Sequence, residues 1–271
     1  MRVHQSSHYN RFLPATIQPA SAKSVDVVLV SPRNPLNIGA VARAMANFGF
    51  ERLAVVTPYA AHWREARSAV GAPELLQNAT ECLSIADAVA GCNLVVGTGT
   101  LTHRKAEQKV VSLPALAPIV QQELARGARV ALVFGPEKHG LTREDLSWCH
   151  LLVEIPTDER QPSMNLGQAV AVCLYELASR AFSSSGEAAG PSDLQAQARS
   201  AAPSGNLDLL ATVIEETMEG AGYSPRSMHS ANRHDLRLLL RRLAPNERDT
   251  RRMLGLFRRI LWRLRRDIQG S

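Results

Sequence analysis

The 271-residue sequence has no long apolar run and only four cysteines. No stretch approaches the roughly 20 apolar residues of a membrane-spanning helix, and residues 1–23 lack the apolar segment of a secretory signal. The cysteines lie far apart, form no CxxC pair and have no histidine at ligand spacing, which argues against a zinc or disulfide framework. We therefore expect a cytoplasmic protein with reduced thiols, a loose tail over 1–23 and no membrane contact.

Several familiar catalytic motifs are also missing. The glycines at 135 and 140 have the spacing of a phosphate-binding P-loop, but Leu141 stands where that loop needs lysine. The glycines at 97 and 99 would need a third at 102 to bind a dinucleotide, and Thr102 is there instead. There is no GxSxG or HExxH segment, so hydrolase and zinc-protease functions have no support.

Positive charge is concentrated near the end of the chain. The net charge is +6, whereas the segment from Ser224 onward has thirteen arginines, no lysine and four acids, which gives +9 and leaves −3 for the rest. Such sorting favours a polyanionic partner, because lysine and arginine that neutralise phosphates release counterions. A solvated helical face is the alternative explanation.

Short β-rich apolar runs alternate with longer stretches of helical periodicity between residues 24 and 182. This alternation predicts an α/β fold, a mostly parallel sheet with helices on both faces. A helix is predicted over Asn37–Phe48, and another carries the apolar stripe Leu166, Val170, Leu174 and Leu177. The predicted strands are Val25–Val30, Arg52–Val56, Leu94–Gly97, Val130–Phe134 and Leu151–Ile155.

A composition change marks a second unit. Residues 183–205 are dominated by Ser, Gly, Pro and Ala without apolar periodicity, which predicts a flexible linker. Beyond it, residues 206–271 predict a small, basic, all-α extension with helices over 206–220, 232–243 and 246–266. Asn206 and Asn246 are the expected N-caps of the first and third of these helices.

Four loops that could bind a ligand follow the predicted strands. Residues 31–39, 134–142 and 161–167 each contain glycine, and 97–100 reads Gly-Thr-Gly-Thr. In an open α/β sheet, ligands bind beyond the carboxyl ends of the strands. These loops are therefore expected to meet around one binding crevice.

Three segments carry a specific resemblance: Asn37 to Arg43, Leu132 to Thr142 and Ser163 to Leu166. In order and spacing they resemble the three motifs of the TrmH-type branch of the SPOUT methyltransferases. Past the linker, the segment from Asp235 to Pro245 and the following Glu247 are similar to the C-terminal extension of TrmJ-like tRNA 2′-O-methyltransferases. The resemblance implies a C-terminal trefoil knot in the sheet, a homodimer that shares residues across its interface, and S-adenosylmethionine as cofactor. The implied substrate is tRNA, methylated on the ribose 2′-hydroxyl of the first anticodon-loop nucleotide, a C or U.

The resemblance also implies site residues, with no metal and no DNA partner. Arg43 would handle the ribose hydroxyl, with Asn37, Glu137, Ser163 and Asn165 shaping the site around it. The cofactor would be held largely by backbone groups of Thr98, Gly99, Thr100, Gly135, Ile155, Pro162, Ser163 and Met164. Glycines suit such a loop because the missing Cβ lets backbone donors approach a ligand.

Simpler explanations remain open for several of these residues. Asn37 and Asn165 could cap helices, Thr142 with Asp145 forms a capping pattern, and Arg43 could be an ordinary surface arginine. The same motifs also serve methylation of ribosomal RNA, and a catalytically idle SPOUT fold could merely bind RNA. A basic DNA-binding protein is a further alternative, but the tail fits no helix-turn-helix.

Overall fold

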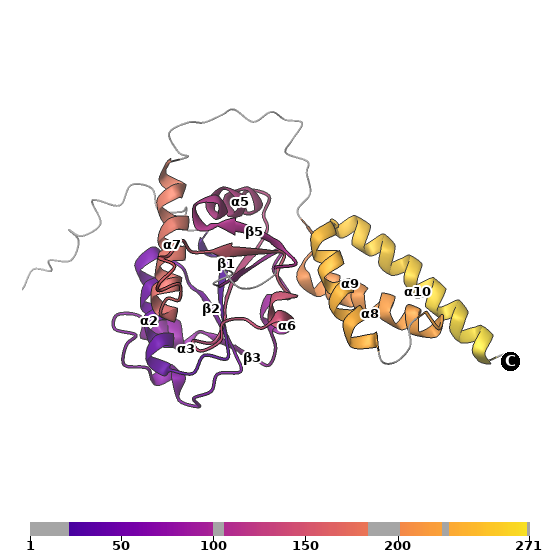
Figure 1. Ribbon diagram of the computed structural model, residues 1–271, viewed down its shortest axis with the longest axis horizontal. Coiled ribbons are helices and arrows are strands. Elements are labelled where there is room, and N and C mark those ends of the chain that lie inside the picture. The colour runs from indigo at the N-terminus through magenta and orange to yellow at the C-terminus, as the bar shows by residue number, and fades with distance from the viewer. Residues whose placement is uncertain (1–21, 100–105, 184–200, 224–227, 270–271) are drawn as a thin grey trace, which may run out of the picture.

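The computed structural model describes residues 22–99, 106–183, 201–223 and 228–269, and shows an α/β unit joined to a helical extension (Figure 1). None of the described helices is long and apolar enough to cross a membrane. Ala22 is buried in the core and Lys23 forms an ion pair with Glu51, so the α/β unit includes the last two residues assigned to the N-terminal tail.

Every strand pairing among the described residues is parallel. The sheet has seven strands in the order β3-β2-β1-β6-β4-β7-β5. The predicted α/β fold is confirmed, whereas threading of the chain into a knot stays a prediction. The strands are β1 (Val25–Val30), β2 (Arg52–Val56), β3 (Thr80–Cys82), β4 (Leu94–Thr98), β5 (Lys109–Ser112), β6 (Val130–Phe134) and β7 (Leu151–Glu154).

Helices cover both faces of the sheet. The larger core joins one face to α2 (Pro35–Phe48), α5 (Leu113–Ala125) and α7 (Leu166–Ser183). The smaller core joins the other face to α4 (Ile85–Val89) and α6 (Arg143–Leu146). The short elements η1 (Trp63–Glu65) and α3 (Pro73–Gln77) pack beside α2. Three of the four cysteines are buried and all are free, as expected of small apolar side chains.

The extension consists of α8 (Ser204–Gly220), α9 (His229–Leu243) and α10 (Glu247–Gln269). Residues 184–200 of the predicted linker lie outside the described residues, but its last five are structured. The prediction that Asn206 caps the first helix is wrong, because α8 begins at Ser204. Carbonyl groups of the α/β unit replace a side-chain cap: the N–H groups of Ser204 and Gly205 donate to Cys92 and Ala90 at 2.9 and 3.0 Å. Asn246 does cap α10, accepting from the Asp249 N–H at 3.0 Å.

Two arginines of α9 join the extension to the α/β unit. The guanidinium groups of Arg237 and Arg241 stack on the Trp148 ring, 3.8 and 5.1 Å from its centroid. Arg237 donates to Ser147 at 2.7 Å, and Arg241 donates to the Trp148 carbonyl at 2.9 Å. Both are buried. These two tail arginines therefore hold together the joint between the α/β unit and the extension.

Candidate active site

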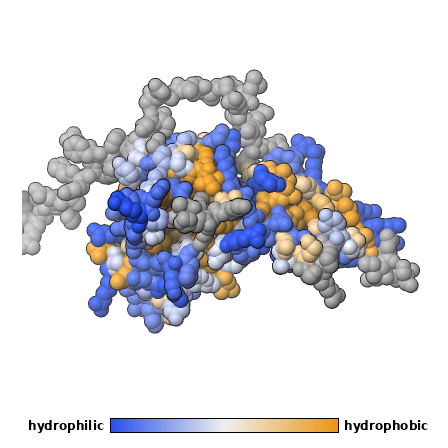
Figure 2. All heavy atoms as spheres, in the orientation of Figure 1, coloured by the Kyte–Doolittle hydropathy of each residue, from blue (hydrophilic) through white to orange (hydrophobic). Residues whose placement is uncertain are grey.

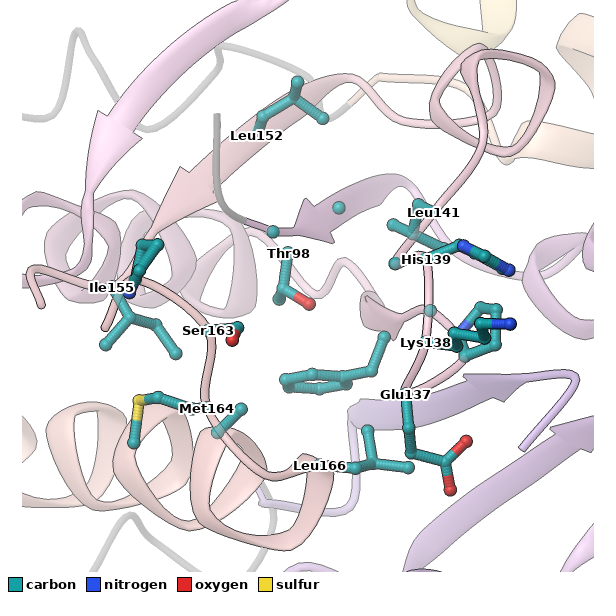
Figure 3. Close-up of a pocket in the computed structure, with 18 of the residues that line it drawn as sticks. Thr98, Glu137, Lys138, His139, Leu141, Leu152, Ile155, Ser163, Met164 and Leu166 are labelled. Atoms are coloured by element: carbon teal, nitrogen blue, oxygen red, sulfur yellow. The ribbon is translucent and has the colours of Figure 1, made fainter. Parts of the chain in front are cut away.

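A cavity of about 280 Å³ opens at the carboxyl ends of β4, β6 and β7. Figure 3 shows Ile155 and Met164 on one side of it and His139 and Leu141 on the other, with the Thr98 hydroxyl between them. Parallel strands bring their carboxyl ends to one edge, so loops distant in sequence meet there. Seven of the eight residues predicted to bind cofactor line this cavity: Thr98, Gly99, Gly135, Ile155, Pro162, Ser163 and Met164. Thr100 lies outside the described residues.

The two glycines singled out in these loops have different physical roles. A Cβ added to Gly99 would meet no atom of the described residues within 4 Å, which fits the expected close approach of a ligand to its backbone. A Cβ on Gly135 would lie 2.2 Å from the Leu141 nitrogen and 2.3 Å from the Gly140 carbonyl carbon. Gly135 is therefore needed because the loop 136–140 folds back over it, a turn that Gly140 completes with φ of +63°.

Other lining residues were not predicted one by one, although several lie in the loop 134–142 that was expected to border the crevice. Phe134, Leu141 and Leu152 are buried apolar side chains that form part of the wall, while Lys138 and His139 add polar groups at the loop 136–140. The Thr98 hydroxyl donates to the Val133 carbonyl at 3.0 Å, which fixes the end of β4 against β6. An apolar wall beside open backbone groups is what a ligand with an adenine ring and a polar amino-acid tail requires. The cavity thus fits S-adenosylmethionine.

Three predicted site residues form one hydrogen-bonded chain beside the cavity. The Asn165 side chain donates to Asn37 Oδ1, and Asn37 Nδ2 donates to Glu137 Oε1, both at 2.9 Å. Asn165 also caps α7 by accepting from the Gly167 N–H at 2.9 Å, so its cap role and its contact with Asn37 are compatible. Asn37 is not a cap, because Asn34 caps α2 and leaves the Asn37 amide to join the first and third motifs.

The Glu137 carboxylate ties the second motif to the start of α2. It accepts from the backbone N–H groups of Arg33 and Asn34 at 3.0 and 3.1 Å as well as from Asn37. Partial burial by itself would raise the pKa of this carboxyl, but the bonds from Asn37 and from backbone N–H groups outweigh it and lower the pKa. Glu137 is therefore an ionised anchor and is poorly suited to donate a proton.

Replacing Glu137 with glutamine should destabilise the fold most at neutral pH. Because folding lowers the pKa, the carboxylate contributes stability that is fully present above its unfolded pKa and is lost as pH falls through the folded value. Urea unfolding from neutral pH to about pH 3 should show the stability difference between wild type and variant shrinking in acid. Glu159→Gln, on an exposed loop, is the matched control. A difference that stayed constant with pH would contradict the anchoring role.

Ser163 and Arg43 occupy different positions relative to the cavity. Ser163 lines it directly, on the loop that precedes α7. Arg43 is exposed on α2 and is not among the cavity-lining residues. The single chain therefore brings together Asn37, Glu137, Ser163 and Asn165 at the cavity or its edge, whereas Arg43 stands apart from them.

The comparisons with known proteins identify the family. The model of the SpoU rRNA Methylase family matches residues 24–175, more than half of the chain. The chain belongs to this family. The TrmJ tRNA (cytidine/uridine-2′-O-)-methyltransferase of Sodalis glossinidius is 30% identical over 241 residues, which cover 86% of this chain and 89% of that protein. The TrmJ tRNA (cytidine-2′-O-)-methyltransferase of Methanocaldococcus jannaschii is 38% identical over 159 residues, covering 56% and 66% respectively.

A solved structure extends the similarity to the whole architecture. The crystal structure of TrmJ from Z. mobilis ZM4 has a TM-score of 0.73 at 28% identity, and the match covers 87% of this chain and 98% of that one. Such coverage is greater than the α/β unit alone can supply, so the similarity includes the extension. The predicted S-adenosylmethionine-dependent methyltransferase of the SpoU family is confirmed.

Proposed function

We propose that this protein methylates the ribose 2′-hydroxyl of the first nucleotide in the tRNA anticodon loop, a C or U, and acts as a homodimer. The observation that carries the site assignment is the cavity, which gathers seven predicted cofactor residues beside the network of Asn37, Glu137 and Asn165. The tRNA assignment rests on the relative from Sodalis glossinidius, whose similarity spans 86% of this chain. The family model alone names rRNA, so ribosomal RNA is the second candidate.

The chemistry asks the protein mainly for positioning. S-adenosylmethionine, when bound, supplies a methyl group on a sulfonium that is already activated for transfer. Backbone groups around Gly99 and Gly135 would hold the cofactor, while the chain from Asn165 to Glu137 fixes the start of α2 beside it. Arg43, carried by α2, clamps the target phosphate or polarises the hydroxyl, whose proton leaves late in the reaction. Since Arg43 lies outside the cavity of its own chain, it acts on RNA laid across the site or at the partner subunit's site.

The substrate assignment is tested by transfer of labelled methyl from S-adenosylmethionine to total tRNA and, separately, to ribosomal RNA. Nuclease digestion and mass mapping then locate any modified ribose. A single 2′-O-methyl at the start of the tRNA anticodon loop is expected. Label confined to ribosomal RNA would overturn the substrate and keep the chemistry, and no label despite cofactor binding would indicate an idle RNA-binding protein.

Arginines of α10 should supply part of the RNA affinity. Arg258 and Arg259 are exposed on this helix, and Trp262 lies under the Arg259 guanidinium, 4.3 Å from it. Figure 2 shows that the extension presents apolar side chains next to hydrophilic ones. Replacing Arg258 and Arg259 with alanine should weaken tRNA binding at every sequence and reduce the slope of log affinity against log salt by about 0.7–0.9 per lost contact. Filter binding over a salt series measures both, and an unchanged slope would show that these arginines do not contact phosphate.

A further inference from the structure

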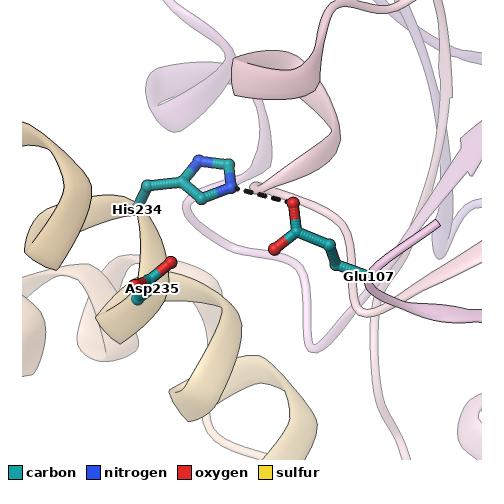
Figure 4. Close-up of side chains that lie close together, drawn as sticks. All are labelled: Glu107, His234 and Asp235. Carbon is teal, nitrogen blue, oxygen red and sulfur yellow. Dashed lines mark ion pairs between the residues drawn. The ribbon is translucent and has the colours of Figure 1, made fainter. Parts of the chain in front are cut away.

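The joint between the α/β unit and the extension brings together three potential metal ligands from distant parts of the chain. Glu107 lies just before β5, and His234 and Asp235 are consecutive residues of α9 (Figure 4). One ligand atom from each of the three lies within 4.8 Å of the others. None of them belongs to the cavity that binds the cofactor.

His234 is buried with one ring nitrogen aimed at this cluster. The residue is 8% exposed, and within the described residues its buried Nε2 atom makes no well-formed hydrogen bond, only a long ion-pair contact. This atom points toward Glu107 Oε1 at 3.5 Å, while the other ring nitrogen, Nδ1, lies 3.5 Å from Glu144 Oε2. A buried polar atom without a partner is costly, and such atoms are rare in folded proteins. The orientation of His234 therefore calls for a partner at Nε2.

We propose that Glu107, His234 and Asp235 bind a divalent transition-metal ion of the Zn²⁺ class. Zinc takes imidazole nitrogen and carboxylate oxygen at about 2.0–2.2 Å, so tetrahedral ligands are separated by roughly 3.4 Å. The distance from His234 Nε2 to Glu107 Oε1 already matches this separation. Asp235 supplies the third ligand after a small rotation of its exposed side chain, and solvent completes the coordination.

Neighbouring side chains orient two of the ligands. A proton on His234 Nδ1 directed at Glu144 leaves the Nε2 lone pair for the metal, an arrangement that metal-bound histidines commonly have. Arg143 donates to Glu107 Oε1 at 2.7 Å and holds that carboxylate in place. Such hydrogen bonds to the ligands preorganise a metal site before the ion binds.

Charge and access are also suitable. Glu107 and Asp235 are both carboxylates that would offset the charge of a divalent cation, and the Glu144 carboxylate lies beside His234. Glu107 and Asp235 also line a cleft between the α/β unit and α9, which gives an ion a path from solvent. A metal here would fasten α9 to the α/β unit and so fix the arginine-rich extension relative to the cofactor cavity.

Metal-free and zinc-titrated full-length protein would test the site by calorimetry and thermal unfolding. After treatment with a chelator, the protein should bind one Zn²⁺ through this cluster, with a rise in Tm on the order of 5 °C at a hundredfold excess over Kd. Mg²⁺ should give no such rise, because it prefers an all-oxygen octahedral shell. Cobalt substitution should give visible absorption bands of nitrogen and oxygen ligation that the His234→Gln variant lacks.

Two variants separate this proposal from a simple ion pair. Asp235→Asn changes an exposed side chain and leaves the contacts of His234 with Glu107 and Glu144 intact, yet it should weaken zinc binding at least tenfold and so reduce the rise in Tm at the same zinc concentration by about half or more. His229→Gln, on the same helix but paired with Glu219, is the control and should bind zinc like wild type. If wild type bound no zinc, or if Asp235→Asn bound it equally well, the three residues would not form a metal site and the proposal would be wrong.

Discussion

Replacing Gly135 with alanine should abolish binding of S-adenosylmethionine and lower thermal stability. The new Cβ would lie 2.2 Å from the Leu141 nitrogen and 2.3 Å from the Gly140 carbonyl carbon, and neither backbone atom can turn away as a side chain does. The loop 136–140 must open to relieve the overlap, which displaces Leu141 from the cavity wall and Glu137 from the start of α2. Overpacking of this kind costs about 1–3 kcal/mol or more.

The measurement is cofactor affinity by calorimetry together with the Tm of the same preparation. Gly255→Ala is the control, because Gly255 lies in α10, where an added Cβ would meet none of the described atoms within 4 Å. Alanine is favoured over glycine inside a helix by about 0.5–1 kcal/mol, so this variant should be as stable as wild type or slightly more so. Cofactor binding that survived in Gly135→Ala would show that the loop 136–140 is not part of the binding wall.

The strands that could be predicted are the buried ones. Continuous apolar runs marked β1, β2, β4, β6 and β7, and the structure has each of them within one residue at either end. The edge strands β3 and β5 were not predicted, because most of their residues are exposed and only Val111 is buried. Pairing with one neighbouring strand makes them strands, and that information is absent from the local sequence.

The site was predictable to the extent that its residues follow strands. Parallel strands deliver their loops to one edge, so motifs in three loops converge without further information. The alternative in which Asn37 caps a helix was wrong for a local reason. Asn34 is the N-cap and Pro35 the first helical residue, so α2 begins before Asn37. The joint with the extension could not be foreseen, because Glu107 and His234 are distant in sequence and meet where α9 docks on Trp148 through Arg237 and Arg241.

Replacing Arg43 with alanine should lower the single-turnover rate of methyl transfer by about 10²–10³, the usual loss when one preorganised donor is removed. Cofactor affinity should not change, because Arg43 does not line the cavity. Thermal stability should stay within about 0.5 kcal/mol of wild type, since the side chain is exposed. Arg126→Ala is the matched control and should retain full activity. Arg126 follows α5 and precedes β6, so it lies near the amino ends of the strands, away from the cavity at their carboxyl ends.

The Arg43→Lys variant distinguishes two ways in which Arg43 could act. A guanidinium has an ordinary pKa above ~12, so its use as a base at neutral pH would cost about 7 kcal/mol. Clamping a phosphate or polarising the hydroxyl requires no such loss, but it uses the planar pair of N–H donors that lysine lacks. We therefore expect the lysine variant to be nearly as slow as alanine in single-turnover assays with tRNA. A lysine variant that kept most of the rate would show that positive charge alone suffices and that no two-pronged contact is made.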